Sequence, residues 1–239
     1  MPTLFYKIIL FILHCIANIF EFLHDISVHI KYKLQLPPND NASVFSEITK
    51  QTKFFNKLPK HITILLGTEE PSYKSLTNIA LWSIAAGIPF VSFYDYKGRL
   101  KESEALFQDQ IKNEKNLDDH IIWHNTHKGT YKNGYVGRKI HIKVLSPNDG
   151  KAQFAKLCKK FSQEEVDIEK ISIQSLDTNL REYYEFPDPD LAIFFGKTLS
   201  MYDYPPWQIS VTEFLNIQSH HNMHHKQFID VLSRYSKCE

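Results

Sequence analysis

Short apolar runs alternate with helically spaced segments along most of the chain. The run HITILL, residues 61–66, is rich in β-branched residues and predicts a buried strand. Apolar residues then recur at helical spacing through residues 72–86 and stop at Gly87, a natural C-cap. PFVSFYDY, residues 89–96, predicts a second strand. Strand, helix and strand in this order predict a βαβ unit with parallel strands.

The alternation continues toward the C-terminus. We expect a charged helix near residues 100–115 and an exposed loop over the weakly hydrophobic residues 123–139. The segments that follow predict a strand, a helix, a strand and a last helix, in the order KIHIKVLS, GKAQFAKLCKKF, DLAIFFG and KQFIDVLSRYSKC. Alternating strands and helices predict an α/β fold with a mostly parallel central sheet and helices on both faces.

The N-terminal segment has a different character. LFYKIILFILHCIANIFEFL, residues 4–23, is mostly Leu, Ile and Phe, and we interpret it as a membrane helix that spans the bilayer or lies in its interface. A buried core helix is the alternative. Lys31 and Lys33 follow the segment and favour a cytosolic C-terminal part. We therefore divide the chain into an N-terminal membrane anchor (1–30), a polar linker (31–58) and a folded domain (59–239).

Composition and charge exclude several classes of protein. The chain has 239 residues and a formal net charge of only +1, so nothing indicates a nucleic-acid-binding protein. Cys15, Cys158 and Cys238 lie far apart in the sequence. They predict neither a disulfide framework nor a zinc site, as is typical of a reducing compartment.

Three local patterns allow more than one interpretation. The histidines of HHNMHH, residues 220–225, have the i, i+4 spacing of a helical zinc site, but a solvated cap region before the last helix is the simpler interpretation. Glu69 and Glu70 fit a solvated first helical turn, capped by Thr68, better than a catalytic pair. The aromatic residues between 90 and 96 indicate sheet packing, or a face that borders a lipid tunnel.

Four strings occur together in one order: WSIAAGIPFVSFYDYKG, IKVLSPNDGKA, PDPDLAIFFG and PPWQISVTEF. With them the chain, from about residue 61 to residue 239, resembles the undecaprenyl diphosphate synthase-like family of cis-prenyltransferases, and in particular its non-catalytic branch. Members of that branch are accessory subunits of dehydrodolichyl diphosphate synthase complexes. The resemblance implies a cis-prenyltransferase-like fold preceded by an N-terminal membrane helix.

The resemblance also implies that groups needed for catalysis are missing. Active members carry an Asp after the first strand, where this chain has Gly67 followed by two glutamates that would repel a diphosphate. The places of an Arg, a second Arg and a Ser that grip the diphosphate hold Phe194, Ser200 and Tyr202. YDYKG, residues 94–98, stands near the place of a Ser-or-Thr-Glu-Asn-Trp string. We therefore expect no catalytic residue and no turnover by this chain alone.

Other family features are retained. Trp207, Gln208 and Glu213 match a Trp-Gln…Glu stretch that the resemblance assigns to the partner interface, with Glu213 as a metal ligand. The implied partner is a catalytic cis-prenyltransferase subunit, which would bind most of the Mg²⁺. The heteromer would condense isopentenyl diphosphate with farnesyl diphosphate at the endoplasmic reticulum membrane, for dolichol and protein glycosylation. An Arg-x-Gly tail, usual in the branch, is not found in the ending RYSKCE.

A second hypothesis remains open at this point. The chain could instead be a membrane-anchored lipid-binding or receptor module that has no prenyltransferase partner. Such a module would be stable and monomeric alone, whereas an accessory subunit would expose apolar surface without its partner.

Overall fold

The computed structural model describes the chain except residues 1, 35–40, 125–137, 165–170, 197 and 239. The described residues fall into two units, Met1–Asp40 and Asn41–Glu239. The first unit contains the helix α1 (Pro2–Leu34), on which large apolar side chains such as Phe11 and Phe20 are exposed. It includes residues 4–23, for which we expected a membrane helix. In the described part of the chain, no helix is both long and apolar enough to cross a bilayer.

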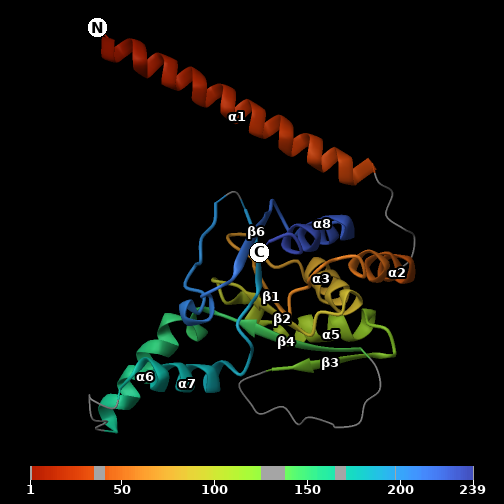
Figure 1. The fold of residues 1–239 in the computed structure, drawn as a ribbon, viewed down its shortest axis with the longest axis vertical. Coiled ribbons are helices and arrows are strands. Elements are labelled where there is room, and N and C mark those ends of the chain that lie inside the picture. Colours follow the sequence, from red (N-terminus) through yellow and green to blue (C-terminus); the bar gives the residue numbers. More distant parts are fainter. Residues whose placement is uncertain (1, 35–40, 125–137, 165–170, 197, 239) are drawn as a thin grey trace. The chain divides into compact units, whose positions relative to one another are not determined.

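The second unit is built on six parallel strands (Figure 1). The strands lie in the order β3-β4-β2-β1-β5-β6, and all five neighbouring pairs are parallel. Their bounds are β1 His61–Leu65, β2 Phe90–Tyr94, β3 Asp119–Trp123, β4 Arg138–Leu145, β5 Leu191–Phe195 and β6 Glu213–Ile217. The predicted parallel α/β sheet is confirmed. The apolar pattern did not predict β3 and β6.

Helices alternate with the strands along most of this unit. They are α2 (Asn41–Thr52), α3 (Tyr73–Ala86), α4 (Arg99–Glu102), α5 (Glu104–Glu114), α6 (Lys151–Gln163), α7 (Ile173–Tyr184) and α8 (His225–Tyr235), with 3₁₀ turns at Pro147–Asp149 and Pro206–Gln208. Gly87 ends α3 at φ 78°, the left-handed conformation that glycine adopts without a steric penalty. Part of the predicted exposed loop, residues 125–137, lies outside the described residues.

The predicted polar linker is wrong over residues 41–52. These residues form α2, and its apolar side chains Val44, Phe45 and Ile48 are buried in the main core. The sequence pattern understated this helix because only one of its faces is apolar, and the polar residues of the other face resemble those of a solvated connector. The folded domain therefore begins at Asn41.

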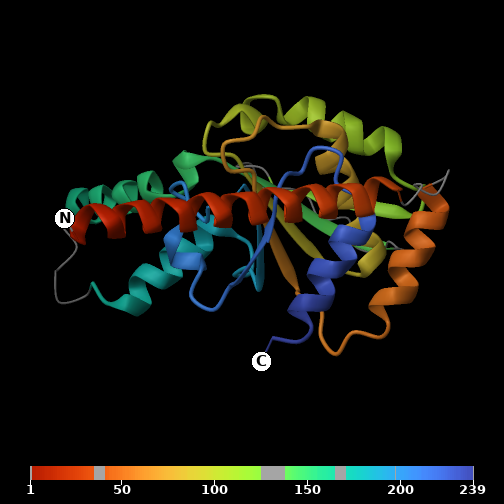
Figure 2. The same ribbon diagram turned by 90° about the horizontal axis from the view of Figure 1, so that it is seen from above.

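The two faces of the sheet are covered differently (Figure 2). One face packs against α2, α3, α5 and α8 in a large aliphatic core that includes Ile62 and Ile64 of β1. On the other face, Leu65, Tyr94 and Leu145 pack against Tyr184 at the end of α7 and against Tyr204. The aromatic residues 90–94 are accordingly divided by the pleat: Phe93 lies in the aliphatic core and Tyr94 in the aromatic cluster.

Candidate functional site

The strand order places a switch of direction between β1 and β5. From β1 the chain proceeds to β2 on one side, and later crosses to β5 on the other side. In open α/β sheets, ligands bind outside the carboxyl ends of the strands at such a switch of direction. Gly67 follows β1 and Gly196 follows β5, so the position where the resemblance implies an Asp lies at this edge.

Gly67 packs tightly against β5 at this edge. Its φ is +60°, and a Cβ at this position would lie 2.6 Å from the carbonyl oxygen of Phe195. Real Cβ atoms do not come so close to a backbone oxygen, and a positive φ is unfavourable for other residues. Gly67 therefore does more than lack a carboxylate, since the backbone of β5 occupies the space from which any side chain would start.

A short loop after β5 covers the same edge. Tyr202, at φ 44°, stacks on Tyr96 with ring centroids 4.7 Å apart, and its carbonyl accepts a hydrogen bond from the Tyr94 hydroxyl. The carbonyl of Asp203 lies so close to Gly150 that a Cβ there would be only 1.9 Å away. Aromatic stacking and backbone packing thus fill the position where the resemblance implies a diphosphate-binding Ser.

The other two substituted positions also lack anion-binding chemistry. Phe194 is the fourth residue of β5, and its half-buried ring packs against the aromatic cluster. Ser200 lies in the loop between β5 and Tyr202 and is half-buried. Neither position carries the guanidinium that an incoming diphosphate would need.

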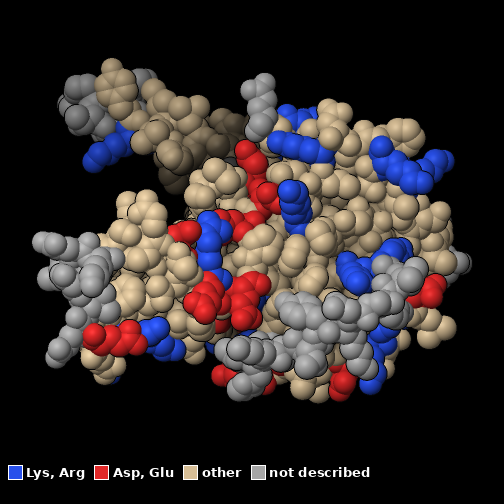
Figure 3. All heavy atoms as spheres, turned by 60° about the horizontal axis from the view of Figure 1, so that its bottom comes forward, with Lys and Arg blue, Asp and Glu red and all other residues tan. Residues whose placement is uncertain are grey.

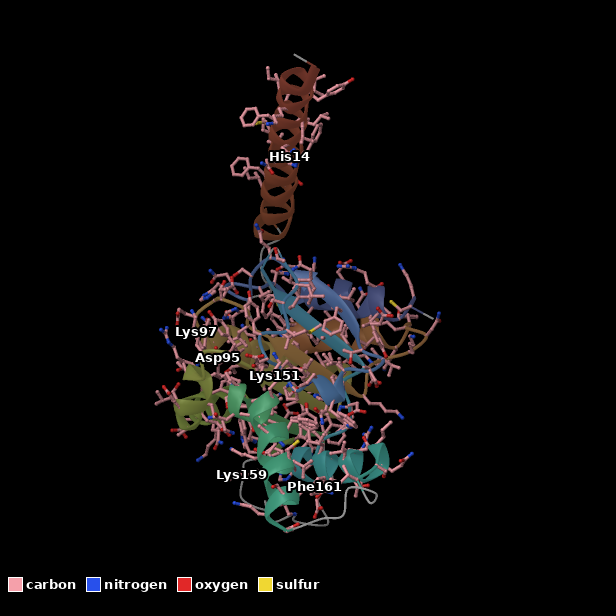
Figure 4. All side chains as sticks on the ribbon, turned by 90° about the vertical axis from the view of Figure 1, so that its left-hand side faces the viewer. His14, Asp95, Lys97, Lys151, Lys159 and Phe161 are labelled. Atoms are coloured by element: carbon pink, nitrogen blue, oxygen red, sulfur yellow. The ribbon has the colours of Figure 1, made fainter. Side chains whose placement is uncertain are left out.

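The YDYKG segment, residues 94–98, stabilises the start of a helix through Asp95. The buried Asp95 carboxylate accepts the amide N–H groups of Lys97, at 2.9 Å, and Leu100, at 3.0 Å. Figure 4 shows Asp95 and Lys97 near each other, with Lys151 on α6 also labelled. These bonds satisfy backbone donors at the start of α4, where helices leave N–H groups without partners. The segment therefore begins a helix after β2.

We expect from the sequence that Glu69 and Glu70 repel a diphosphate, but in the structure each carboxylate is paired within the chain. The Oε1 atom of Glu70 lies 2.8 Å from Lys97 Nζ, and Oε2 contacts Arg99. The hydrogen bond from Lys97, followed by that from Arg99, lowers the pKa of Glu70. Thr68 does not cap a helix here, because α3 starts only at Tyr73 with Ser72 as its N-cap. Cations that follow β2 thus offset the Glu70 carboxylate.

Glu69 is bound to a buried histidine that the sequence pattern placed in solvent. His220 is 0% exposed, and its Nδ1 donates to Glu69 Oε2 at 2.5 Å. Its Nε2 accepts from the Ser72 amide at 3.1 Å. Burial lowers the pKa of His220, which favours the neutral ring that these two bonds require. His220 thereby joins the loop after β1 to the loop after β6.

The neighbouring histidines are not arranged as a helical zinc site. His225 is buried and its Nε2 lies 2.9 Å from Glu47, whereas His224 is the N-cap of α8. Among the described residues, Glu69, His220 and His221 have ligand atoms within 4.8 Å of one another. Both nitrogens of His220 are already hydrogen-bonded, so a metal would have to displace one of those bonds. We interpret the cluster as a structural link.

The predicted interface residues lie in two separate places. Trp207 Nε1 donates to Asp177 Oδ1 at 2.8 Å, and its ring stacks on Phe154 at 6.4 Å. The two rings border a cavity of about 230 Å³ whose lining is almost entirely apolar and includes Leu180 and Tyr183. Trp207 thus holds α6 and α7 within its own chain, and Gln208 beside it is buried.

Glu213 is the exposed first residue of the edge strand β6. Since all strands are parallel, it lies at the amino edge of the sheet, opposite the edge that carries Gly67. Within the residues that the structure describes, no group of three potential metal-ligating side chains includes Glu213. Among the described residues, neither Gly67 nor the isolated Glu213 carboxylate fits a Mg²⁺ site.

The chain was compared with known protein families and with known proteins. No family model matches the chain. It is 30% identical to the dehydrodolichyl diphosphate synthase complex subunit Nus1 of Mus musculus, over 77% of this chain and 65% of that protein. It is 28% identical to the subunit of the same name, NUS1, from Homo sapiens, over 77% and 66%. The Saccharomyces cerevisiae NUS1 subunit is 23% identical, over 99% and 73%.

The chain spans just under two thirds of the length of the mouse and human relatives. Among solved structures, it is similar to the lavandulyl diphosphate synthase of Lavandula x intermedia with a TM-score of 0.50. That match covers 81% of this chain and 98% of the synthase, at 15% identity. At this identity the likeness shows a shared fold.

Proposed function

Because the chain belongs to the NUS1-like cis-prenyltransferase family, we propose that it is a non-catalytic accessory subunit of a dehydrodolichyl diphosphate synthase complex. The complex would condense isopentenyl diphosphate with farnesyl diphosphate, and its polyprenyl diphosphate product would feed dolichol synthesis and protein glycosylation. The names of four relatives, each a subunit of such a complex, support this assignment.

The observation that carries the non-catalytic role is the closed edge at Gly67. The Phe195 carbonyl leaves no room for a side chain at position 67. Tyr202 lies stacked on Tyr96 over the same edge. A diphosphate site needs donors and an accessible backbone, and this edge offers aromatic rings and paired carboxylates instead. The chain alone therefore does not turn over substrate in this proposal.

The partner is a catalytic cis-prenyltransferase subunit with intact Asp and Arg motifs, which binds the Mg²⁺. We place the interface on the exposed edge of β6, at Glu213. Val211, two residues before this strand, is 84% exposed, which favours an interaction surface there. An edge strand also leaves backbone N–H and C=O groups unpaired, and a partner would satisfy them. Trp207 contacts α6 and α7 of its own chain and lies outside this surface.

The first unit attaches the protein to the endoplasmic reticulum membrane in this proposal. Apolar side chains lie exposed along α1, among them Ile8, Phe11, Leu13 and Phe22. A helix of this kind binds in the interface of a bilayer by burying its apolar residues among the acyl chains. Lys31 and Lys33 follow the apolar segment and favour a cytosolic folded domain.

One observation favours the second function, a membrane-attached lipid-binding module. The cavity beside Trp207 has a volume of about 230 Å³ and an almost wholly apolar lining. Apolar cavities with a few polar groups at their rim are typical of small-molecule sites. Such a module would be a stable monomer without a prenyltransferase partner.

Co-purification distinguishes the two functions. The chain is co-expressed with a catalytic cis-prenyltransferase homologue that carries the intact motifs, and association is measured by size-exclusion chromatography. The accessory subunit elutes with the homologue, and Glu213→Ala weakens the complex at unchanged stability of the chain. Leu117→Ala is the matched control, because Leu117 is 94% exposed and far from β6 in the sheet order. A monomer that never co-elutes contradicts the proposal.

A further inference from the structure

Basic side chains gather where two helices end together. Lys50 lies in the last turn of α2, three further lysines follow in residues 53–60 before β1, and the end of α8 adds an arginine and a lysine. We call this the basic turn: Lys50, Lys53, Lys57, Lys60, Arg234 and Lys237. Lys57 Nζ lies 5.1 Å from the centre of the Tyr235 ring, which places the end of α8 beside it. In Figure 2 the end of α8 and the chain after α2 lie on the same side of the domain.

The cations of the basic turn have few opposing charges. None of the ion pairs found among the described residues uses any of these six side chains. Asp190 and Glu213 both lie near Tyr235, and Asp190 Oδ2 accepts the amide N–H groups of Lys60 and His61. Glu47 on α2 is bound to His225. In a chain whose net charge is only +1, this is a marked local excess of positive charge.

An aromatic side chain stands in the middle of the basic turn. Phe54 is 78% exposed, although the neighbouring Phe55 and Leu58 pack against the core. Cations at the carboxyl ends of α2 and α8 are favourable for the helices themselves. That effect does not explain why Phe54 is exposed, because keeping an apolar ring in water is unfavourable. Cations around an aromatic ring are the combination that binds anionic lipid surfaces.

We propose that the basic turn is a second membrane contact, which binds anionic lipid headgroups while Phe54 enters the interface. The proposal rests on the membrane attachment through α1 proposed above. Residues 35–40 separate α1 from α2 and span at most roughly 25 Å. A lipid-bound α1 therefore keeps α2 within reach of the same surface. The contact would hold the folded domain against the bilayer rather than leave it on a tether.

Lysines elsewhere on the domain provide a matched comparison. Lys159 and Lys160 are exposed near the end of α6, and Figure 4 labels Lys159 there. The side of the molecule shown in Figure 3 carries Lys or Arg and Asp or Glu side chains close together. Removing two charges from α6 changes the net charge as much as removing two from the basic turn.

Vesicle co-sedimentation of the full chain tests the proposal. Vesicles of phosphatidylcholine, with and without phosphatidylserine, are compared at low and high salt. Binding to the neutral vesicles reports α1 and is the same for all variants. Phosphatidylserine increases binding at low salt, and Lys50→Gln/Lys53→Gln reduces that gain roughly 30-fold. Lys159→Gln/Lys160→Gln leaves it within roughly 3-fold. Phe54→Ala weakens binding to the anionic vesicles, while Leu117→Ala does not.

Three outcomes would overturn the proposal. Equal losses in the two lysine pairs would mean that only net charge matters. A gain from phosphatidylserine that does not depend on the basic turn would place the contact elsewhere. Unchanged vesicle binding combined with lost co-purification of the catalytic homologue would make the basic turn a protein interface. Absence of binding to neutral vesicles, by contrast, would contradict only the attachment through α1.

Discussion

The carbonyl oxygen of Phe195 lies against Gly67 so closely that a Cβ at position 67 would be 2.6 Å from it. This contact joins the ends of β1 and β5 at the edge where ligands bind in parallel α/β sheets. In the proposed non-catalytic role, this contact is the reason that position 67 cannot carry a carboxylate. Gly67, where the resemblance implies an Asp, is held by the backbone packing around it.

Replacing Gly67 tests this contact against a matched glycine. Gly98 also has a positive φ, +75°, but has no atom within 4 Å of an added Cβ. Gly98→Ala therefore costs only the conformational penalty, about 1 kcal/mol. Gly67→Ala adds the clash with Phe195 and costs about 3 kcal/mol. The free energies of unfolding from urea titrations decide the point, and equal losses in the two variants would refute the closed edge.

The link between Glu69 and His220 predicts a large stability effect at an exposed loop. His220→Ala removes two hydrogen bonds and leaves the half-buried Ser72 amide without its acceptor, which costs roughly 3 kcal/mol. His221→Ala, in the adjacent exposed position, changes stability by less than about 0.5 kcal/mol. Thermal unfolding of both variants is the measurement. Similar melting temperatures would show that the link is not made.

Stability is also expected to fall with acidification because of His61. Burial lowers the pKa of His61 from 6.5 to about 4, and its ring is hydrogen-bonded to Pro187 and Ser92. Between pH 6.5 and about pH 4, His61 is protonated in the unfolded chain but stays neutral in the folded chain. The stability from the neutral ring is therefore full above pH 6.5 and is lost as the pH falls to 4, by roughly 3 kcal/mol.

The variant His61→Gln isolates this contribution. It should be less stable than the parent at neutral pH, and the slope of its unfolding free energy between pH 6.5 and 4 should be shallower. Urea titrations at a series of pH values supply both slopes. Identical slopes would assign the acid sensitivity to other groups, such as His124, whose pKa burial also lowers to about 4.

The two retained family residues are expected to act differently. Trp207→Phe keeps the ring beside Phe154 and removes the N–H that Asp177 accepts, so stability falls by about 1 kcal/mol. Glu213→Ala removes an exposed side chain and leaves stability within about 0.5 kcal/mol, but weakens binding of the catalytic subunit. Unfolding and co-purification, measured on the same two variants, separate a packing role from an interface role.

Most of the sheet could be predicted from the sequence because its strands are short apolar runs between turn residues. β1, β2, β4 and β5 lie where the apolar pattern predicts them. The edge strands β3 and β6 were missed, since DHIIW and EFLNI mix polar and apolar residues as half-exposed strands do. The helix α2 was missed for the same reason, because only one of its faces is buried.

The candidate site was less predictable, because its features depend on neighbours far apart in the sequence. The resemblance implies that Gly67 stands where active members carry an Asp. Its closure by Phe195, and the bond between Glu69 and His220, join segments separated by more than a hundred residues. No local pattern reports such a pairing. The histidines were placed in solvent because a polar cluster before a helix usually lies there.

Prenyltransferase activity tests the central claim most directly. Membranes that contain this chain alone, the catalytic homologue alone, or both are supplied with farnesyl diphosphate, labelled isopentenyl diphosphate and Mg²⁺. We expect no product from this chain alone, and far more product from the pair than from the homologue alone. Product from this chain alone would contradict the closed edge at Gly67, and no gain from the pair would contradict the accessory role.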